Sequence, residues 1–157
     1  SSAARQLRSA PRDFILENGI GMTSLNDLLA RSDFISLNAD LNPTSRHIIN
    51  ACTLGLVKPS AILINTARGP LVDEPALVAA LQAGRLAGAA LDVFEVEPLP
   101  LDSPLMKMDN VMLAAHNSNS SPAAWERVHK NTIHNLLESL KIPHLDLDRI
   151  WPGMLSD

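Results

Sequence analysis

Three ionisable side chains in this sequence have the types needed to bind an anion and to move a proton. Arg68 lies in a Thr-Ala-Arg-Gly turn, where its guanidinium can grip a carboxylate or a carbonyl oxygen with two parallel hydrogen bonds. Glu97 and His116 each follow an apolar segment, and a carboxylate beside an imidazole orients the ring and favours its protonated form. The alternatives are a surface arginine and a structural histidine, and the residue types alone leave both open.

The remaining candidates are weaker. Asp92 closes an apolar run, where it can contact a ligand amide or cap the following turn. His129 and His134 lie five residues apart on a predicted helix, off the spacing at which two histidines share a zinc ion. His47 and His144 are predicted to be surface residues. We therefore expect no metal catalysis.

Alternating strands and helices must position these residues. Apolar runs predict strands at residues 34–37, 61–64, 87–91 and 110–113. Helices are predicted at residues 25–30 after the N-cap Ser24, 53–57, 74–83 between Asp73 and Gly84, and about 121–140. This alternation indicates a parallel sheet with right-handed crossovers.

A polar cluster follows each predicted strand. The four clusters are residues 38–40, 66–68, 92–97 and 116–120. The carboxyl ends of parallel strands meet at one edge of the sheet, where open α/β folds bind their ligands. The sequence therefore predicts a common crevice that contains Arg68, Asp92 and Glu97.

Composition narrows the class of protein. The chain has 157 residues, 46% of them hydrophobic, which is enough for one globular domain. A net charge of −4 without a dense Lys/Arg cluster argues against nucleic acid as a partner. No apolar run reaches the roughly 18 residues of a membrane helix, so no membrane partner is expected. The lone Cys52 is expected to be a small packed side chain and suits a reducing cytoplasm.

Five segments together carry a recognisable pattern. They are Ser-Asp-Phe-Ile-Ser-Leu from Ser32, Leu-Ile-Asn-Thr-Ala-Arg-Gly from Leu63, Leu-Val-Asp-Glu from Leu71, Gly-Ala-Ala-Leu-Asp-Val-Phe-Glu-Val-Glu-Pro from Gly88, and the strand that ends at His116. In order and spacing, from about Leu25 to Leu140, they resemble the nucleotide-binding domain of D-isomer-specific 2-hydroxyacid dehydrogenases. That family includes phosphoglycerate, formate, glycerate and D-lactate dehydrogenases and the C-terminal-binding-protein corepressors.

The resemblance implies a fold and a domain plan. The fold is an α/β, Rossmann-type doubly wound parallel sheet that lacks its N-terminal portion, because the family's glycine-rich loop and ribose-binding acid belong upstream of most of this chain. Residues 1–142 then form the NAD(P)-binding domain, and residues 143–157 are a tail that returns toward a substrate domain. The first residue is Ser1 rather than Met, which fits either processing or part of a longer polypeptide.

The resemblance also implies hydride transfer between a nicotinamide cofactor, NAD or NADP, and a D-2-hydroxy acid or 2-keto acid. The catalytic residues are then Arg68, which orients the substrate, His116, the acid/base, and Glu97, which supports the histidine. Asp92 meets the nicotinamide carboxamide. The full set of implied cofactor-binding residues is Asn38, Thr66, Ala67, Arg68, Asp92, His116 and Ser118.

Several departures from the family pattern border the pocket and leave the identity of the acid open. The usual His-x-Pro-Leu is Asn-Ala-Asp-Leu at residues 38–41, and the Thr-Pro before the histidine is Ala114-Ala115. Small residues normally follow the histidine, and here residues 117–119 are Asn-Ser-Asn. The cationic segment Arg8–Arg12 favours NADP.

Taken together, these features predict a cytoplasmic NAD(P)-dependent dehydrogenase that acts on CH–OH donors. The family resemblance adds the expectation of a homodimer. Two alternatives stay open. One is a non-enzymatic, dinucleotide-sensing interaction module of the corepressor type, and the other is a truncated, inactive domain.

Overall fold

The structure is a computed structural model that describes residues 12–117 and 120–141 of the chain. The described residues divide into two compact units, with the boundary between His116 and Asn117. The first unit contains the β-sheet, and the second contains a single long helix among its described residues. All predicted site residues lie in the first unit except Ser118, which is outside the described residues.

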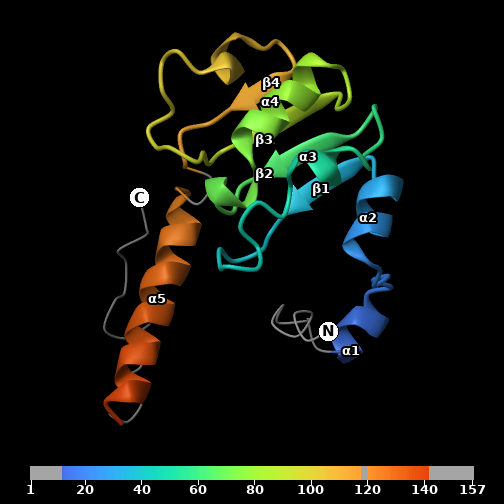
Figure 1. Ribbon diagram of the computed structural model, residues 1–157. Coiled ribbons are helices and arrows are strands. Elements are labelled where there is room, and N and C mark those ends of the chain that lie inside the picture. The colour runs from blue at the N-terminus through green and yellow to red at the C-terminus, as the bar shows by residue number, and fades with distance from the viewer. Residues whose placement is uncertain (1–11, 118–119, 142–157) are drawn as a thin grey trace. The chain divides into compact units, whose positions relative to one another are not determined.

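A four-stranded, all-parallel sheet forms the centre of the first unit (Figure 1). Its strands lie side by side in chain order: β1 (Phe34–Leu37), β2 (Ile62–Asn65), β3 (Gly88–Leu91) and β4 (Val111–Leu113). The last residues of the strands are in register, since Leu37 is paired with Asn65, Asn65 with Leu91, and Leu91 with Leu113. The predicted parallel sheet is confirmed, and all four following loops begin at one level edge.

The helices are short in the first unit and long in the second. They are α1 (Arg12–Glu17), α2 (Leu25–Arg31), α3 (Ala51–Leu54), α4 (Glu74–Gln82) and α5 (Pro122–Ser139), with the 3-10 turns η2 (Gly69–Leu71) and η3 (Pro104–Lys107) between them. The sequence does not predict α1. No helix in the described part of the chain is both long and apolar enough to cross a membrane.

Local side-chain chemistry sets the helix ends. The carboxylate of Asp73 accepts a hydrogen bond from the amide of Ala76 at 3.1 Å and so caps α4, as predicted. Gly84 follows α4 in the left-handed region with φ +64°, also as predicted. Helix α3 begins at Ala51, two residues before the predicted start, because the side chain of Asn50 forms a capping box with Thr53.

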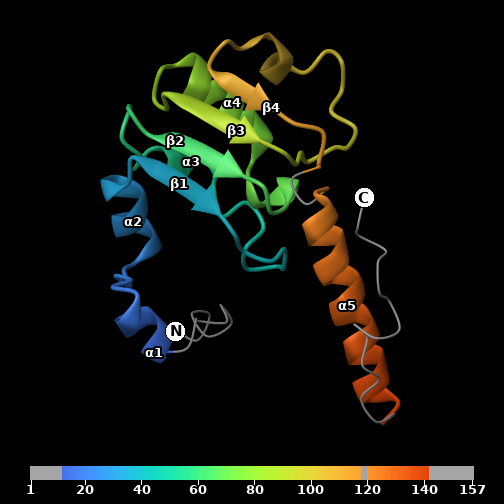
Figure 2. The same ribbon diagram turned by 180° about the vertical axis from the view of Figure 1, so that it is seen from behind.

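Aliphatic side chains from one face of the sheet form the core. Ile35 and Leu63 alternate with more exposed neighbours and, together with Leu91, pack with Leu54 of α3 and Leu77 of α4. Helices α3 and α4 lie on this same face, in front of the strands in Figure 1 and behind them in Figure 2. The prediction of a packed Cys52 is wrong, because Cys52 of α3 is exposed.

Candidate active site

The turn after β2 is organised by a buried amide. Asn65 ends the strand with its side chain on the core side and is 1% exposed. Its Nδ2 donates to the carbonyl oxygen of Arg68 at 3.0 Å, and its Oδ1 accepts from the amide of Ala67 at 3.1 Å. The sequence assigns no role to Asn65, although a polar residue at an inward-facing strand end is the signal that could have found it.

The turn that carries Arg68 lies against the loop after β3. Gly69 is buried, and a Cβ atom built on it would overlap the carbonyl group of Phe94. The side chain of Arg68 is exposed, and its Nη1 donates to the carbonyl oxygen of Ala67 at 2.6 Å. The structure thus brings the backbone of the arginine turn against the Phe94–Glu97 loop. Within the described residues, no hydrogen bond or ion pair joins the guanidinium to Glu97 or His116.

Glu97 and His116 form a pair across the loops after β3 and β4. Oε2 of Glu97 lies 2.8 Å from Nδ1 of His116, and Oε1 of Glu97 accepts from the amide of Phe94 at 3.0 Å. The hydrogen bond from His116, followed by the one from Phe94, lowers the pKa of Glu97 below its ordinary value. A carboxylate only accepts, so Nδ1 carries the proton in this pair and Nε2 is the nitrogen available to a ligand.

The backbone of His116 is unusual as well. It adopts the left-handed conformation with φ +54°, which is uncommon for residues other than glycine and occurs often at functional sites. The side chain of His116 is 47% exposed and that of Glu97 is 37% exposed. Solvent, or a ligand that replaces it, therefore reaches the His116–Glu97 pair.

Asp92 lies one residue past the end of β3 and is 4% exposed. Its amide donates to the carbonyl oxygen of Asn65 at 3.0 Å, which continues the ladder between β2 and β3 past the strand ends. The remaining predicted cofactor residues at this edge are less enclosed. Thr66 and Asn38 are exposed, and Nδ2 of Asn38 donates to Oγ of Ser36 at 3.1 Å.

A second histidine and glutamate pair lies in the same group of loops. His47 is predicted to be a surface residue, but its side chain is 35% exposed and its Nε2 lies 2.6 Å from Oε1 of Glu95. Oε2 of Glu95 accepts from the amide of Glu74 at 3.1 Å. The sequence gives no sign of this contact, because it joins positions 48 residues apart.

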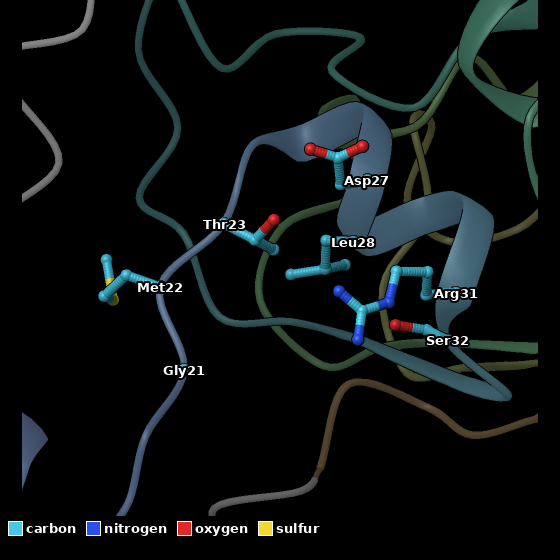
Figure 3. Close-up of a pocket in the computed structure, with 7 residues that line it drawn as sticks. All are labelled: Gly21, Met22, Thr23, Asp27, Leu28, Arg31 and Ser32. Carbon is cyan, nitrogen blue, oxygen red and sulfur yellow. The ribbon is translucent and has the colours of Figure 1, made fainter.

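A surface depression lies beside α2, before the start of β1 and not at its carboxyl end, and Figure 3 shows the residues around it. Its lining comes from α2 and the segment before it: Gly21, Met22, Thr23, Asp27, Leu28, Arg31 and Ser32. None of the predicted site residues lines it. Across residues 12–117 and 120–141, no group of three His, Cys, Asp or Glu side chains is arranged to hold a metal ion.

The residues of the candidate site lie in the part of the chain that is similar to known proteins. Residues 5–118 match the family model for the NAD binding domain of D-isomer specific 2-hydroxyacid dehydrogenase. The glyoxylate reductase of Thermofilum pendens is 49% identical over 119 residues, which are 76% of this chain and 35% of that protein. The D-3-phosphoglycerate dehydrogenase of Methanocaldococcus jannaschii is 37% identical over 158 residues, covering 92% of this chain and 30% of that protein.

Solved structures show the same likeness. The crystal structure of a glyoxylate reductase from Paecilomyes thermophila has a TM-score of 0.76 and 36% sequence identity, covering 87% of this chain and 40% of that one. A D-isomer specific 2-hydroxyacid dehydrogenase from Xanthobacter autotrophicus Py2, solved in complex with NADPH and MES, has a TM-score of 0.58 and 49% identity, covering 61% and 30%. The chain spans about a third of the length of the curated relatives it matches.

Proposed function

The chain belongs to the D-isomer specific 2-hydroxyacid dehydrogenase family, and we propose on that premise that it acts in an NAD(P)-dependent oxidoreductase whose substrates are a D-2-hydroxy acid and the corresponding 2-keto acid. The observation that carries the proposal is the contact of 2.8 Å between Glu97 and His116 at the carboxyl edge of a parallel sheet. A histidine held by a carboxylate is the acid/base that alcohol and ketone interconversion requires.

His116 moves the proton in this mechanism. Its Nδ1 proton stays on the hydrogen bond to Glu97, while Nε2 gives a proton to the nascent alkoxide oxygen during reduction and removes it during oxidation. Glu97 stabilises the imidazolium and fixes the ring orientation through Oε2. Such positioned acid/base groups typically contribute about 10²–10⁴-fold to rate.

Arg68 is proposed to bind the substrate. Its side chain is exposed at the edge where the polar loops meet, and the buried amide of Asn65 fixes the turn beneath it. A guanidinium can hold the substrate carboxylate, or polarise the carbonyl oxygen, with paired hydrogen bonds. The present bond from Arg68 to Ala67 is an intramolecular one that a carboxylate can replace.

The residues at this edge fit the nicotinamide end of a dinucleotide. Asp92 is an almost fully buried acid at the carboxyl end of β3, which is the type of group that accepts hydrogen bonds from a carboxamide. We propose that Asp92, Asn38, Thr66, Ala67, Arg68, His116 and Ser118 hold the cofactor, NAD or NADP. When bound, the nicotinamide supplies the hydride to C2 of the keto acid or accepts it from the hydroxy acid. The composition of the cationic segment Arg8–Arg12 favours NADP, and all of this segment except Arg12 lies outside the described residues.

The test uses the natural protein with glyoxylate, hydroxypyruvate and larger 2-keto acids, each with NADH and NADPH. We expect cofactor oxidation to be visible by absorbance, and His116→Ala to lower kcat about 10²–10⁴-fold with only a modest change in the dissociation constant of the cofactor. His129→Ala is the matched control, because it removes an exposed histidine of α5. Cofactor binding without turnover of any keto acid would favour the sensing module instead, and unchanged turnover in His116→Ala would refute the assignment of the histidine.

Two finer expectations remain part of this proposal. A homodimer is expected from the family, and sedimentation of the natural protein tests it. A cytoplasmic location is expected from the single cysteine, and fractionation of the source cells tests that.

A further inference from the structure

Glu95 lies where three loops of the first unit meet. Its Oε1 contacts Nε2 of His47 at 2.6 Å and lies 3.9 Å from Nη2 of Arg46. Its Oε2 accepts from the amide of Glu74 at 3.1 Å, and its own amide donates back to Oε2 of Glu74 at 3.3 Å. The side chain of Glu95 is only 20% exposed. These contacts fix the position of the Glu95 carboxylate.

Each group that holds Glu95 lies close in sequence or in space to a proposed catalytic residue. The amide of His47 donates to the carbonyl oxygen of Pro70 at 2.9 Å, within the turn that directly follows Arg68. Glu74 begins α4, which that turn leads into. Glu95 itself is two residues before Glu97 on the loop after β3. Glu95 therefore fastens the Arg68 turn and the Glu97 loop to one another.

The backbone of the Phe94–Glu97 loop transmits this fixation to Glu97. The amide of Phe94 donates to Oε1 of Glu97 at 3.0 Å, and the carbonyl of Phe94 packs on Gly69. A loop held at Glu95 thus keeps Phe94 in place to orient the Glu97 carboxylate, which in turn orients His116.

Not all of the electrostatic interactions around Glu95 are favourable. Glu74 is a second acid at this point, and burial together with the nearby charge of Glu95 raises the pKa of Glu74 above its ordinary value. His47 and Arg46 face Glu95 from the loop after β1. The left-handed backbone of His47, with φ +50°, is a further local cost. The repulsion between the two acids and the left-handed backbone of His47 are both unfavourable, and both occur where the loops that carry the proposed site meet.

We propose that Glu95 and His47 are positioning residues, which set the Glu97–His116 pair relative to the Arg68 turn. This inference rests on the proposed function, since it assigns a purpose to the geometry of that site. Neither side chain is required to touch substrate or cofactor. A carboxylate displaced by about 1 Å from its productive place can cost on the order of 10²-fold in rate.

The kinetic test compares Glu95→Ala, Glu95→Gln, His47→Ala and His47→Gln in the natural protein. We expect kcat/KM for the 2-keto acid to fall about 10–100-fold in the alanine variants. His47→Gln should recover most of the loss, because the glutamine amide can still donate to Oε1 of Glu95. Lys58→Ala is the control, because it removes an exposed ion pair of 2.9 Å with Asp33 at the other end of the sheet. A fall in melting temperature with kcat and KM within twofold of wild type would overturn the proposal.

A second measurement separates this inference from the proposed function. The Glu97 carboxyl is titrated by NMR in wild type, Glu95→Ala and Lys58→Ala. Removing the negative charge of Glu95 would by itself lower the pKa of Glu97, whereas loss of the hydrogen bonds that Glu97 accepts from His116 and Phe94 raises that pKa. We expect the pKa of Glu97 to rise in Glu95→Ala and to stay unchanged in Lys58→Ala. An unchanged or lowered value in Glu95→Ala overturns the positioning role even if no keto acid is ever turned over.

Discussion

Replacing Gly69 by alanine tests whether close approach of two loops builds the site. A Cβ at this position would meet the carbonyl group of Phe94 and lie 2.6 Å from the amide nitrogen of Glu95, whereas ordinary contact begins at 3.4 Å. All of these atoms are backbone, so no side-chain rotation relieves the overlap. Gly69 has no left-handed φ, so the expected cost is steric. Overpacking of this kind costs about 1–3 kcal/mol or more.

The assay is thermal and urea unfolding of Gly69→Ala beside two matched glycine variants. Gly21→Ala meets nothing within 4 Å and should change stability by less than about 0.5 kcal/mol. Gly84→Ala also meets nothing, but its φ of +64° should cost about 1–2 kcal/mol. Gly69→Ala should lose most, with a melting temperature roughly 2–12 °C lower. A stability equal to that of Gly21→Ala would refute the close approach of the two loops.

Three further predictions concern buried or paired polar groups. Because the pKa of Glu97 is lowered from 4.5, the Glu97–His116 contact stabilises the fold above pH 4.5, and this contribution is lost as the pH falls through the lowered pKa. Solvent screening of so exposed a pair limits the contribution to about 1 kcal/mol. The difference in unfolding free energy between wild type and Glu97→Gln should therefore shrink on acidification. The pKa of Glu74 is raised by burial, so the sign is opposite: Glu74→Gln should be the more stable protein near pH 7, with the gain disappearing below pH 4.5 in the same unfolding series. Asn65→Leu should cost about 2–5 kcal/mol in urea unfolding, because it leaves the Ala67 amide and the Arg68 carbonyl without their partner, and Asn65→Asp should cost at least as much, because it buries a carboxylate with one oxygen against the Arg68 carbonyl.

The sequence predicts the sheet and the location of its functional edge because both depend on local patterns. Short aliphatic runs separated by capped helices fix the strands, and Asp73 and Gly84 mark the ends of α4 through chemistry that involves only neighbouring residues. In a parallel sheet, residues just past the strand ends meet at one edge. The polar clusters after the strands could therefore be placed together without knowing any contact between them.

The contacts that fix the loops are not local, and the sequence does not predict them. Gly69 reads as a turn glycine after an arginine, but the structure places it where another backbone needs room. Asn65 reads as one letter of a motif, although its amide makes both hydrogen bonds that shape the Arg68 turn. Neither role produces a periodicity or a spacing, because each depends on which loop lies opposite.

The two histidine and glutamate pairs show how a pair that transfers protons differs from a pair that holds a loop in place. Both histidines have left-handed backbones, and both glutamates come from one short loop. The side chains of the His47–Glu95 pair are 35% and 20% exposed, and Nε2 of His47 is the ring nitrogen that contacts the acid. In the His116–Glu97 pair they are 47% and 37% exposed, so Nε2 of that histidine can exchange a proton with a ligand. A pair that transfers protons must remain accessible, whereas a pair that holds a loop is strengthened by burial. The sequence alone does not distinguish the two pairs, because it does not show which histidine each glutamate contacts.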